Sequence, residues 1–159
     1  MTLDPAGPLG NHDALRGSAP ARIDEKSRLK VPTIFRGAFQ DDKGPDVFVT
    51  SLAGDSVRIY PMPVWLEIER KLSAMPSNHP SRLKFLDRVN YYGQMVEMDG
   101  QGRLLLPQLL REAAQLKGEV AVTGNLSHLV VRNLEGYRAE IEEQPFTPED
   151  EKTLDDLGI

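Results

Sequence analysis

The side chains best suited to chemistry occur as two Asp and Arg pairs with the same spacing. Asp24 precedes Arg28 by four residues, and Asp99 precedes Arg103 by four residues. The planar guanidinium group of arginine can hold a phosphate, or O6 and N7 of a guanine, through two parallel hydrogen bonds. A carboxylate directed at DNA would be repelled by the phosphates, so we expect both aspartates to brace turns. Each arginine could therefore bind such an acceptor, or it could simply pair with the nearby aspartate and stabilise the turn.

Both pairs belong to an internal repeat. Residues 23–36 align without gaps on residues 98–111, and the Asp, Arg, Leu, Pro and final Arg are identical. Each copy then continues with two β-type runs and a helix, and Trp65 and Tyr137 occupy matching places in the two helices, where we expect core anchors. The predicted runs and helix are 46–50, 57–60 and 63–74 in the first copy, and 119–123, 129–132 and 134–143 in the second. Two small modules of this kind should interlock into one core.

The repeated loop has a specific turn chemistry. In the second copy the loop reads Asp-Gly-Gln-Gly, which predicts a tight hairpin in which Asp99 and Gly102 fix the turn that aims Arg103. The first copy has Ser27 in place of that glycine. If the position needs a positive φ, serine costs of order 1 kcal/mol or forces a different turn, so we expect strain or a reshaped first loop.

A proline follows each loop. Pro32 and Pro107 end the second strand of each copy and suit the start of short helices at 33–39 and 108–116, with Gly118 as the stop of the latter. Between the two copies, residues 81–92 predict an amphipathic linker helix, because apolar residues recur there at helical spacing.

The two loops also carry a resemblance to a known family. The segment Arg16-Gly17, residues 21–32 (ARIDEKSRLKVP) and residues 98–107 (MDGQGRLLLP) resemble the paired boxes of the MraZ family, and the similarity runs from about Leu15 to about Gln144. The resemblance implies an AbrB-like double-split (swapped-hairpin) β-barrel built from tandem repeats. It further implies a sequence-specific transcriptional regulator of the bacterial division and cell-wall gene cluster. Such a regulator would bind direct repeats in promoter DNA as a ring-shaped homo-oligomer.

The candidate DNA-binding residues come from both lines of reasoning. Carried over from the boxes, the resemblance points to Asp24, Lys26, Arg28, Asp99 and Arg103. The basic stretch around the first loop adds two more cations. The DNA-binding set is therefore Lys26, Arg28, Arg103, Arg22 and Lys30, and the loop-bracing set is Asp24, Asp99 and Gly102. We expect the two loops to lie side by side at one end of the barrel. For Arg36 and Arg111 the alternatives of a DNA contact and a packed helix residue stay open.

The distribution of charge supports this interpretation better than the total does. The net charge of −5 disfavours a nucleic-acid partner, but residues 140–159 hold eight acids and one base, so the rest of the chain carries +2. Residues 16–36 hold six bases against two acids. We expect the acidic tail and the N-terminal extension to be mobile, although Thr147 and Pro148 could cap and start a short helix reaching Leu157.

These observations define the predicted organisation. The fold class is mainly β with peripheral helices (α+β), divided into a flexible extension (1–14), a first repeat (15–80), a linker helix with the second repeat (81–143) and an acidic tail (144–159). The chain has no cysteine, no apolar run near the roughly 20 residues that span a bilayer and no secretory signal, so we expect a soluble protein of the cytoplasm and nucleoid.

Other function classes find less support. His12, His79 and His128 lack ligand-like spacing, and we expect surface or packing roles for them and no bound metal or cofactor. No constellation of catalytic residues is visible, so an enzyme with a small-molecule substrate is not predicted. The alternative is an oligomeric adaptor that does not bind DNA and engages protein partners through its acidic tail.

Overall fold

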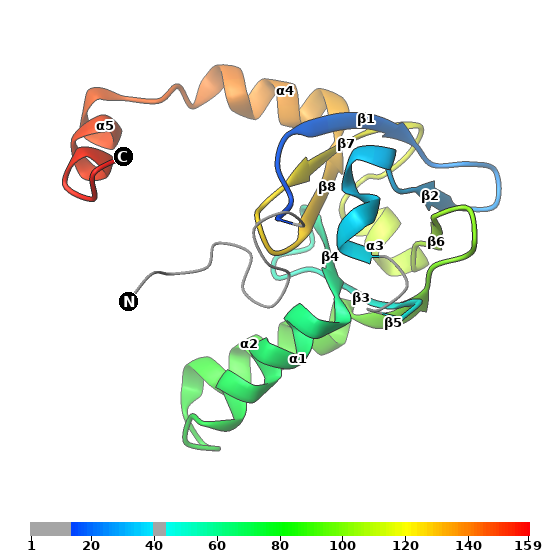
Figure 1. The fold of residues 1–159 in the computed structure, drawn as a ribbon, viewed down its shortest axis with the longest axis horizontal. Helices are drawn as coiled ribbons and strands as arrows, with labels where there is room; N and C mark the ends of the chain where they lie inside the picture. The colour runs from blue at the N-terminus through cyan, green and yellow to red at the C-terminus, as the bar shows by residue number, and fades with distance from the viewer. Residues whose placement is uncertain (1–13, 40–43) are drawn as a thin grey trace.

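The structure is a computed structural model that describes residues 14–39 and 44–159. Eight strands form its centre, and helices lie around them (Figure 1). The strands are β1 (Ser18–Arg22), β2 (Arg28–Lys30), β3 (Asp46–Thr50), β4 (Val57–Pro61), β5 (Gln94–Glu97), β6 (Arg103–Leu105), β7 (Glu119–Gly124) and β8 (Leu129–Asn133). The helices are the 3-10 helix η2 (Thr33–Phe39) and the α-helices α1 (Met62–Ser73), α2 (Pro80–Tyr92), α3 (Gln108–Ala113), α4 (Leu134–Glu143) and α5 (Pro148–Asp155). The prediction of a mainly β protein with peripheral helices is confirmed.

The two repeats interleave rather than fold side by side. A six-stranded antiparallel sheet has the order β1-β7-β8-β4-β3-β5, so the first strand of each repeat pairs with the third strand of the other repeat. Strands β2 and β6 form a separate two-stranded antiparallel ladder. Equivalent residues of the two repeats meet in it, since Leu29 pairs with Leu104. The arrangement therefore has approximate two-fold symmetry, as interlocked repeats require.

Both repeats contribute to one core. On the ladder, Leu29 and Leu104 point inward and are fully buried, and Val31 and Leu106, the next residues on that face, are buried as well. On the large sheet Val57, Ile59, Leu129 and Val131 are buried, and so are residues on the opposite face such as Tyr60 and Val130. On the ladder, burial alternates and fixes the register, because a slip by one position would turn the buried leucines to water.

The helices around the sheet agree with the predictions in place but differ in detail. The segment 33–39 is a 3-10 helix, and α3 ends at Ala113 rather than at Leu116. The early end has a local cause, because Gln115 takes a left-handed conformation (φ 54°) and the N–H of Leu116 bonds the carbonyl of Arg111. Gly118, the expected stop, also has a positive φ but lies in the loop that follows.

The two matched aromatic residues have different environments. Trp65 on α1 is buried and stacks on Phe48, with ring centroids 4.3 Å apart, so it is the core anchor that was predicted. Tyr137 on α4 is only half-buried and lies under the guanidinium group of Arg132, 4.5 Å from its ring centroid. The prediction of a core anchor was wrong for Tyr137, because α4 carries no buried residue at all.

The C-terminal segment is helical. Thr147 caps α5 in a capping box with Asp150, and Pro148 is its first residue, as the sequence predicted, although the helix ends at Asp155. In Figure 1, α4 leads away from the sheet and α5 lies at the far end of this arm. The expected N-terminal extension lies almost wholly outside the described residues, but Ala14 is buried and Leu15 bridges to Leu126, so both belong to the folded part. None of the described helices combines the length and the apolar composition needed to cross a bilayer.

Candidate nucleic-acid interface

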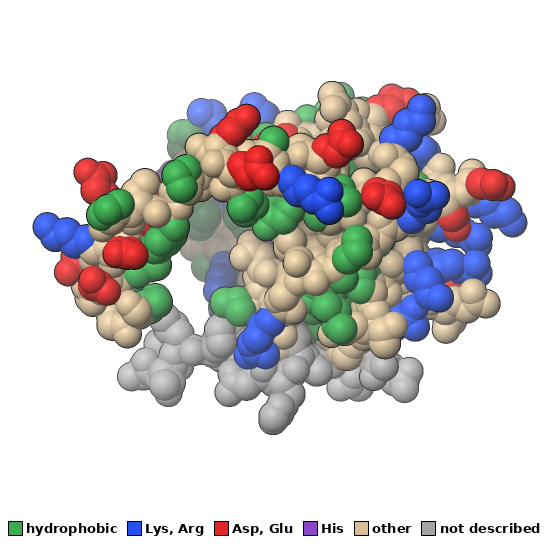
Figure 2. All heavy atoms as spheres, turned by 90° about the horizontal axis from the view of Figure 1, so that it is seen from above, with side chains coloured by type: hydrophobic (Ala, Val, Ile, Leu, Met, Phe, Trp, Pro, Cys, Tyr) green, Lys and Arg blue, Asp and Glu red, His purple; other side chains and the backbone are tan. Residues whose placement is uncertain are grey.

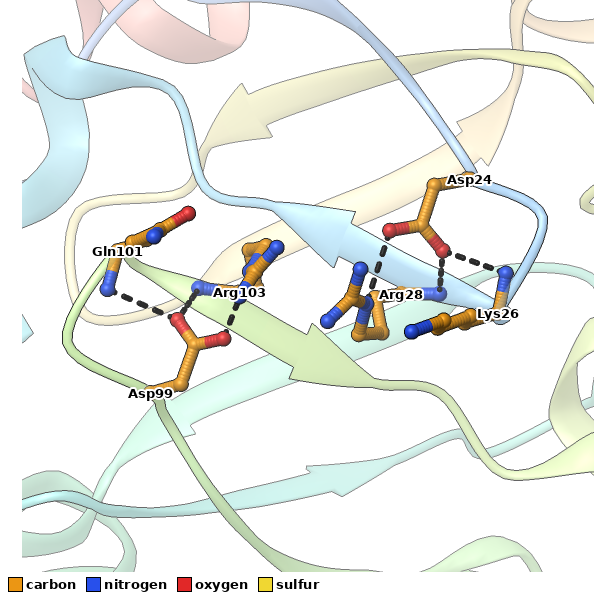
Figure 3. Close-up of polar contacts among 6 residues, drawn as sticks. All are labelled: Asp24, Lys26, Arg28, Asp99, Gln101 and Arg103. Atoms are coloured by element: carbon orange, nitrogen blue, oxygen red, sulfur yellow. Dashed lines mark hydrogen bonds and ion pairs between the residues drawn. The ribbon is translucent and has the colours of Figure 1, made fainter.

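The first repeated loop is held together by one carboxylate. Oδ1 of Asp24 accepts hydrogen bonds from the backbone N–H groups of Lys26 and Arg28, both at 2.9 Å, and Oδ2 accepts one from Nε of Arg28 at 2.9 Å (Figure 3). These donors, the backbone N–H of Arg28 first, hold the pKa of the Asp24 carboxyl below its usual value. All three hydrogen bonds to the Asp24 carboxylate therefore come from the same turn, and the carboxylate faces Arg28.

The second loop repeats this geometry residue by residue. Oδ1 of Asp99 accepts from the N–H groups of Gln101 and Arg103 at 2.9 Å, and Oδ2 accepts from Nε of Arg103 at 2.7 Å. The same set of donors, led by the backbone N–H of Arg103, lowers the pKa of Asp99 to about 2. Both aspartates therefore stay ionised at neutral pH and fix the direction of the arginine four residues on.

Ser27 adopts the backbone conformation of the glycine that it replaces. Its φ is 64°, against 76° for Gly102, and both residues donate from N–H to the carbonyl of the loop aspartate at 3.0 Å. The first loop is therefore not reshaped, and serine accepts the strain of a left-handed conformation. At Gly102 a side chain would meet a second obstacle, because an added Cβ would lie 2.8 Å from Nε of Arg36.

The ladder between the loops determines which side chains of β2 and β6 face the core and which face outward. Lys30 pairs with Arg103 and Arg28 with Leu105, while Leu29 and Leu104 point into the core. By the alternation of strands, the outer face of the ladder therefore presents Arg28, Lys30, Arg103 and Leu105 together. The loops lie at opposite ends of this ladder (Figure 3), so the expectation of loops side by side was wrong. It failed because β2 and β6 run antiparallel, each starting from its own loop.

The two arginines keep part of their binding capacity. Each uses Nε for its aspartate, and within residues 14–39 and 44–159 neither terminal nitrogen has a recorded hydrogen-bond partner. Their side chains are 27% and 29% exposed, so each is partly packed against the protein and partly open to solvent. An arginine held by Nε can still offer both terminal NH₂ groups to an acceptor outside the protein.

The remaining predicted cations are spread around the ladder. Lys30 is exposed on its outer face, and Lys26 is exposed at the tip of the first loop. Arg22, at the end of β1, lies 3.6 Å from Glu119, and both side chains are mostly exposed. An exposed pair of this kind contributes little to stability and can exchange its partner for a phosphate.

Arg36 and Arg111, which the sequence left undecided, have equivalent structural contacts. Nε of Arg36 donates to the carbonyl of Val31 at 3.2 Å, and Nε of Arg111 donates to the carbonyl of Leu106 at 3.0 Å. Each arginine thereby ties its short helix to the end of the ladder. These contacts support the interpretation as packed helix residues.

His128 has a packing role. It is buried, its ring stacks on Tyr60 with centroids 4.5 Å apart, and burial together with the charge of Arg58 lowers its pKa to about 4. No group of acidic or histidine side chains suited to a metal ion occurs among the residues that the structure describes.

Sequence reasoning overlooked one residue of the interface. Leu105 lies on the outer face, opposite Arg28 at one end of the ladder, and is 57% exposed. The repeat alignment carried the signal, because Leu105 matches the lysine Lys30 there.

The amino-acid sequence resembles those of known proteins over nearly the whole chain. The chain is 57% identical over 145 residues to the Transcriptional regulator MraZ of Koribacter versatilis, covering 91% of this chain and 99% of that protein. It is 49% identical over 144 residues to the protein of the same name from Acidobacterium capsulatum, with the same coverage. A family profile described as "MraZ protein, putative antitoxin-like" matches residues 93–157.

The class of protein follows from these relatives. The chain falls among transcriptional regulators and not among enzymes. Within that class it belongs to the MraZ family. The resemblance seen in the two loop sequences is thereby confirmed.

Proposed function

We propose that this chain regulates transcription by binding double-stranded DNA in a sequence-specific manner through the ladder β2–β6 and its two loops. The observation that carries the proposal is the pair of Asp-braced arginines, Arg28 and Arg103, which the two-fold symmetry of the repeats brings onto one outer face. Its expected target is the promoter of the bacterial division and cell-wall gene cluster, which makes the cytoplasm and the nucleoid its place of action.

The geometry suits this task because the arginines are oriented before DNA arrives. A bond from Nε to a carboxylate holds the guanidinium plane, so less conformational entropy is lost when its terminal nitrogens bind a guanine or a phosphate. Lys26 and Lys30 add flexible cations for neighbouring phosphates. Binding through such contacts weakens steeply as salt rises, because condensed counterions are released.

A single copy offers few base contacts, so assembly is part of the proposal. A ring that places successive copies on successive direct repeats of the promoter converts later contacts into intramolecular ones. The affinity then rises without any new contact in the individual copy. Direct repeats fit a ring in which each copy contacts the next through the same head-to-tail (heterologous) interface.

A DNA-binding titration tests the proposal. The probe is the DNA upstream of the protein's own gene, with a scrambled duplex as control, at two salt concentrations. We expect tight, selective binding by the wild type and its loss in the double variant Arg28→Ala, Arg103→Ala. Arg70→Ala is the matched control, because Arg70 is an exposed arginine paired with Glu67 on α1, outside the ladder and loops.

The rival function is the adaptor that binds protein partners through the acidic tail. The observation in its favour is α5, which lies at the end of an arm and carries no buried residue. Weak retention on heparin and equal affinity of the wild type for the promoter and the scrambled duplex would favour the adaptor. Ser27 no longer supports it, because the first loop keeps the conformation of the second.

A further inference from the structure

The outer face of the ladder breaks the symmetry of the fold beneath it. Arg28 and Arg103 are equivalent, but Lys30 in the first repeat corresponds to Leu105 in the second. Just beyond the ladder, Lys26 corresponds to Gln101. One half of the face is therefore basic, whereas the other half keeps its arginine and replaces lysine by an apolar side chain.

Leu105 has no role in the core that would explain it. It is 57% exposed, while its neighbours Leu104 and Leu106 are buried and supply the inward contacts of this strand. Its partner across the ladder is Arg28, and directly opposed side chains have Cβ atoms about 4.5–5.5 Å apart. An exposed leucine thus lies beside an arginine on the surface proposed to meet DNA.

The chemistry of the major groove supplies a partner for this pair. The groove is wide enough for a two-stranded β-ribbon, and the apolar group that it displays is the 5-methyl of thymine. We propose that Leu105 contacts the 5-methyl group of a thymine in the major groove and so determines specificity at that base pair. The inference rests on the proposed function and names the base that one side chain of the interface selects.

The asymmetry also gives the complex a direction. A face with two identical halves would bind a site equally well in either orientation. Lys30 lies on one half of the face and Leu105 on the other. The proposed contact with a phosphate and the proposed contact with a thymine therefore lie on different halves. Each copy then binds in one orientation, as repeats of the same direction require.

Replacement of thymine by deoxyuridine tests the contact, since it removes only the methyl group. In the operator identified by the titration above, each thymine is replaced in turn, and the Kd is measured for the wild type and for Leu105→Ala. At one position per repeat we expect deoxyuridine to weaken the wild type by about fourfold, the value of one buried methyl group. Leu105→Ala should bind the thymine operator that much more weakly and should not distinguish the two bases.

Two further variants separate the contact from general effects. Lys30→Ala should weaken binding to the thymine and deoxyuridine operators alike and keep their ratio, because it removes a charge. Leu105→Met keeps an apolar side chain and should preserve the discrimination. Thermal unfolding of each variant verifies the fold, and Leu105→Ala should unfold as the wild type does because the residue is exposed.

The possible failures can be told apart. Selective DNA binding without any deoxyuridine effect, or an equal effect in the wild type and in Leu105→Ala, would refute the inference and leave the proposed function intact. A change of oligomeric mass in Leu105→Ala, measured by light scattering, would reassign the side chain to contact between copies. Absence of selective binding by the wild type would remove the proposed function itself.

Discussion

Ser27 carries a strain that its counterpart Gly102 avoids. Both hold a left-handed backbone conformation, with φ of 64° and 76°, and both close the same turn. For a residue with a side chain this conformation costs roughly 1–2 kcal/mol. We therefore predict that Ser27→Gly raises the free energy of unfolding by about 1 kcal/mol in a urea titration, without loss of DNA binding.

The mirror substitution at the second loop provides the control. Gly102→Ala should destabilise the protein more than Ser27→Gly stabilises it, because the added Cβ combines the same backbone strain with a contact 2.8 Å from Nε of Arg36. If Ser27→Gly left stability unchanged, the side chain of Ser27 would have to offset the strain by an interaction of its own.

Asp99 makes the stability of the loop depend on pH. Its pKa is about 2 in the folded protein against an ordinary value of 3.8, so the folded state favours the ionised carboxylate. The stabilisation is fully present above about pH 4 and is lost as the pH falls from about 4 to about 2. We predict that Asp99→Asn flattens the dependence of the unfolding midpoint on pH in this window, and an unchanged slope would show that the carboxylate does not act through its charge.

The sequence predicted the role of the loop aspartates but not the positions of every residue around them. The spacing of Asp99 and Arg103 predicts a braced turn, because local turn chemistry depends on neighbours in the chain. The contact from Arg36 to the carbonyl of Val31 and the exposure of Leu105 depend on how the helix and the ladder pack. Such tertiary contacts cannot be deduced from spacing along the chain.

At the scale of elements, the ladder β2–β6 joins the outer face, which we propose binds DNA, to the core. Leu104 is fully buried on its inner side, and Leu105, the next residue, is 57% exposed on its outer side. Leu104→Ala should cost about 2–5 kcal/mol of stability, as a cavity in the core does, whereas Leu105→Ala should cost well under 1 kcal/mol. Urea unfolding of the two variants compares them directly, and equal losses would contradict this orientation of the ladder.

The repeat alone predicted most of the elements, because apolar β-type runs next to glycine turns indicate strands directly. It placed the strands within a residue or so of 46–50, 57–61, 119–124 and 129–133. It could not foresee that β2 and β6 pair antiparallel with their loops at opposite ends. That relation follows from the symmetry axis between the repeats, and a sequence alignment carries no information on its direction.

The whole molecule separates its charges along its length. In Figure 2 acidic side chains gather on the C-terminal arm on the left, whereas lysine and arginine side chains gather at the opposite end, where β2 and β6 lie in Figure 1. The segment 140–159 holds eight acids and one base. Its negative field opposes the approach of DNA and is screened by salt.

Removal of this arm should therefore change DNA binding. We predict that deletion of residues 144–159 tightens binding at low salt, and that the difference shrinks as the ionic strength rises. The measurement is a pair of salt titrations on the full chain and the truncated chain. An affinity unaffected by the deletion at low salt would discard the idea that the tail shields the interface.

The interleaving of the repeats affects how the protein can fold during its synthesis on the ribosome. Ser18 in β1 pairs with Thr123 in β7, so the first strand has no partner until nearly the whole chain has been synthesised. At about 5–20 residues per second this wait lasts on the order of 5–20 seconds. During that time the nascent first repeat exposes unpaired strand edges on the ribosome. A premature stop in the second repeat would release a chain without any complete sheet, and quality control by chaperones and proteases would act on it before it could compete for the promoter.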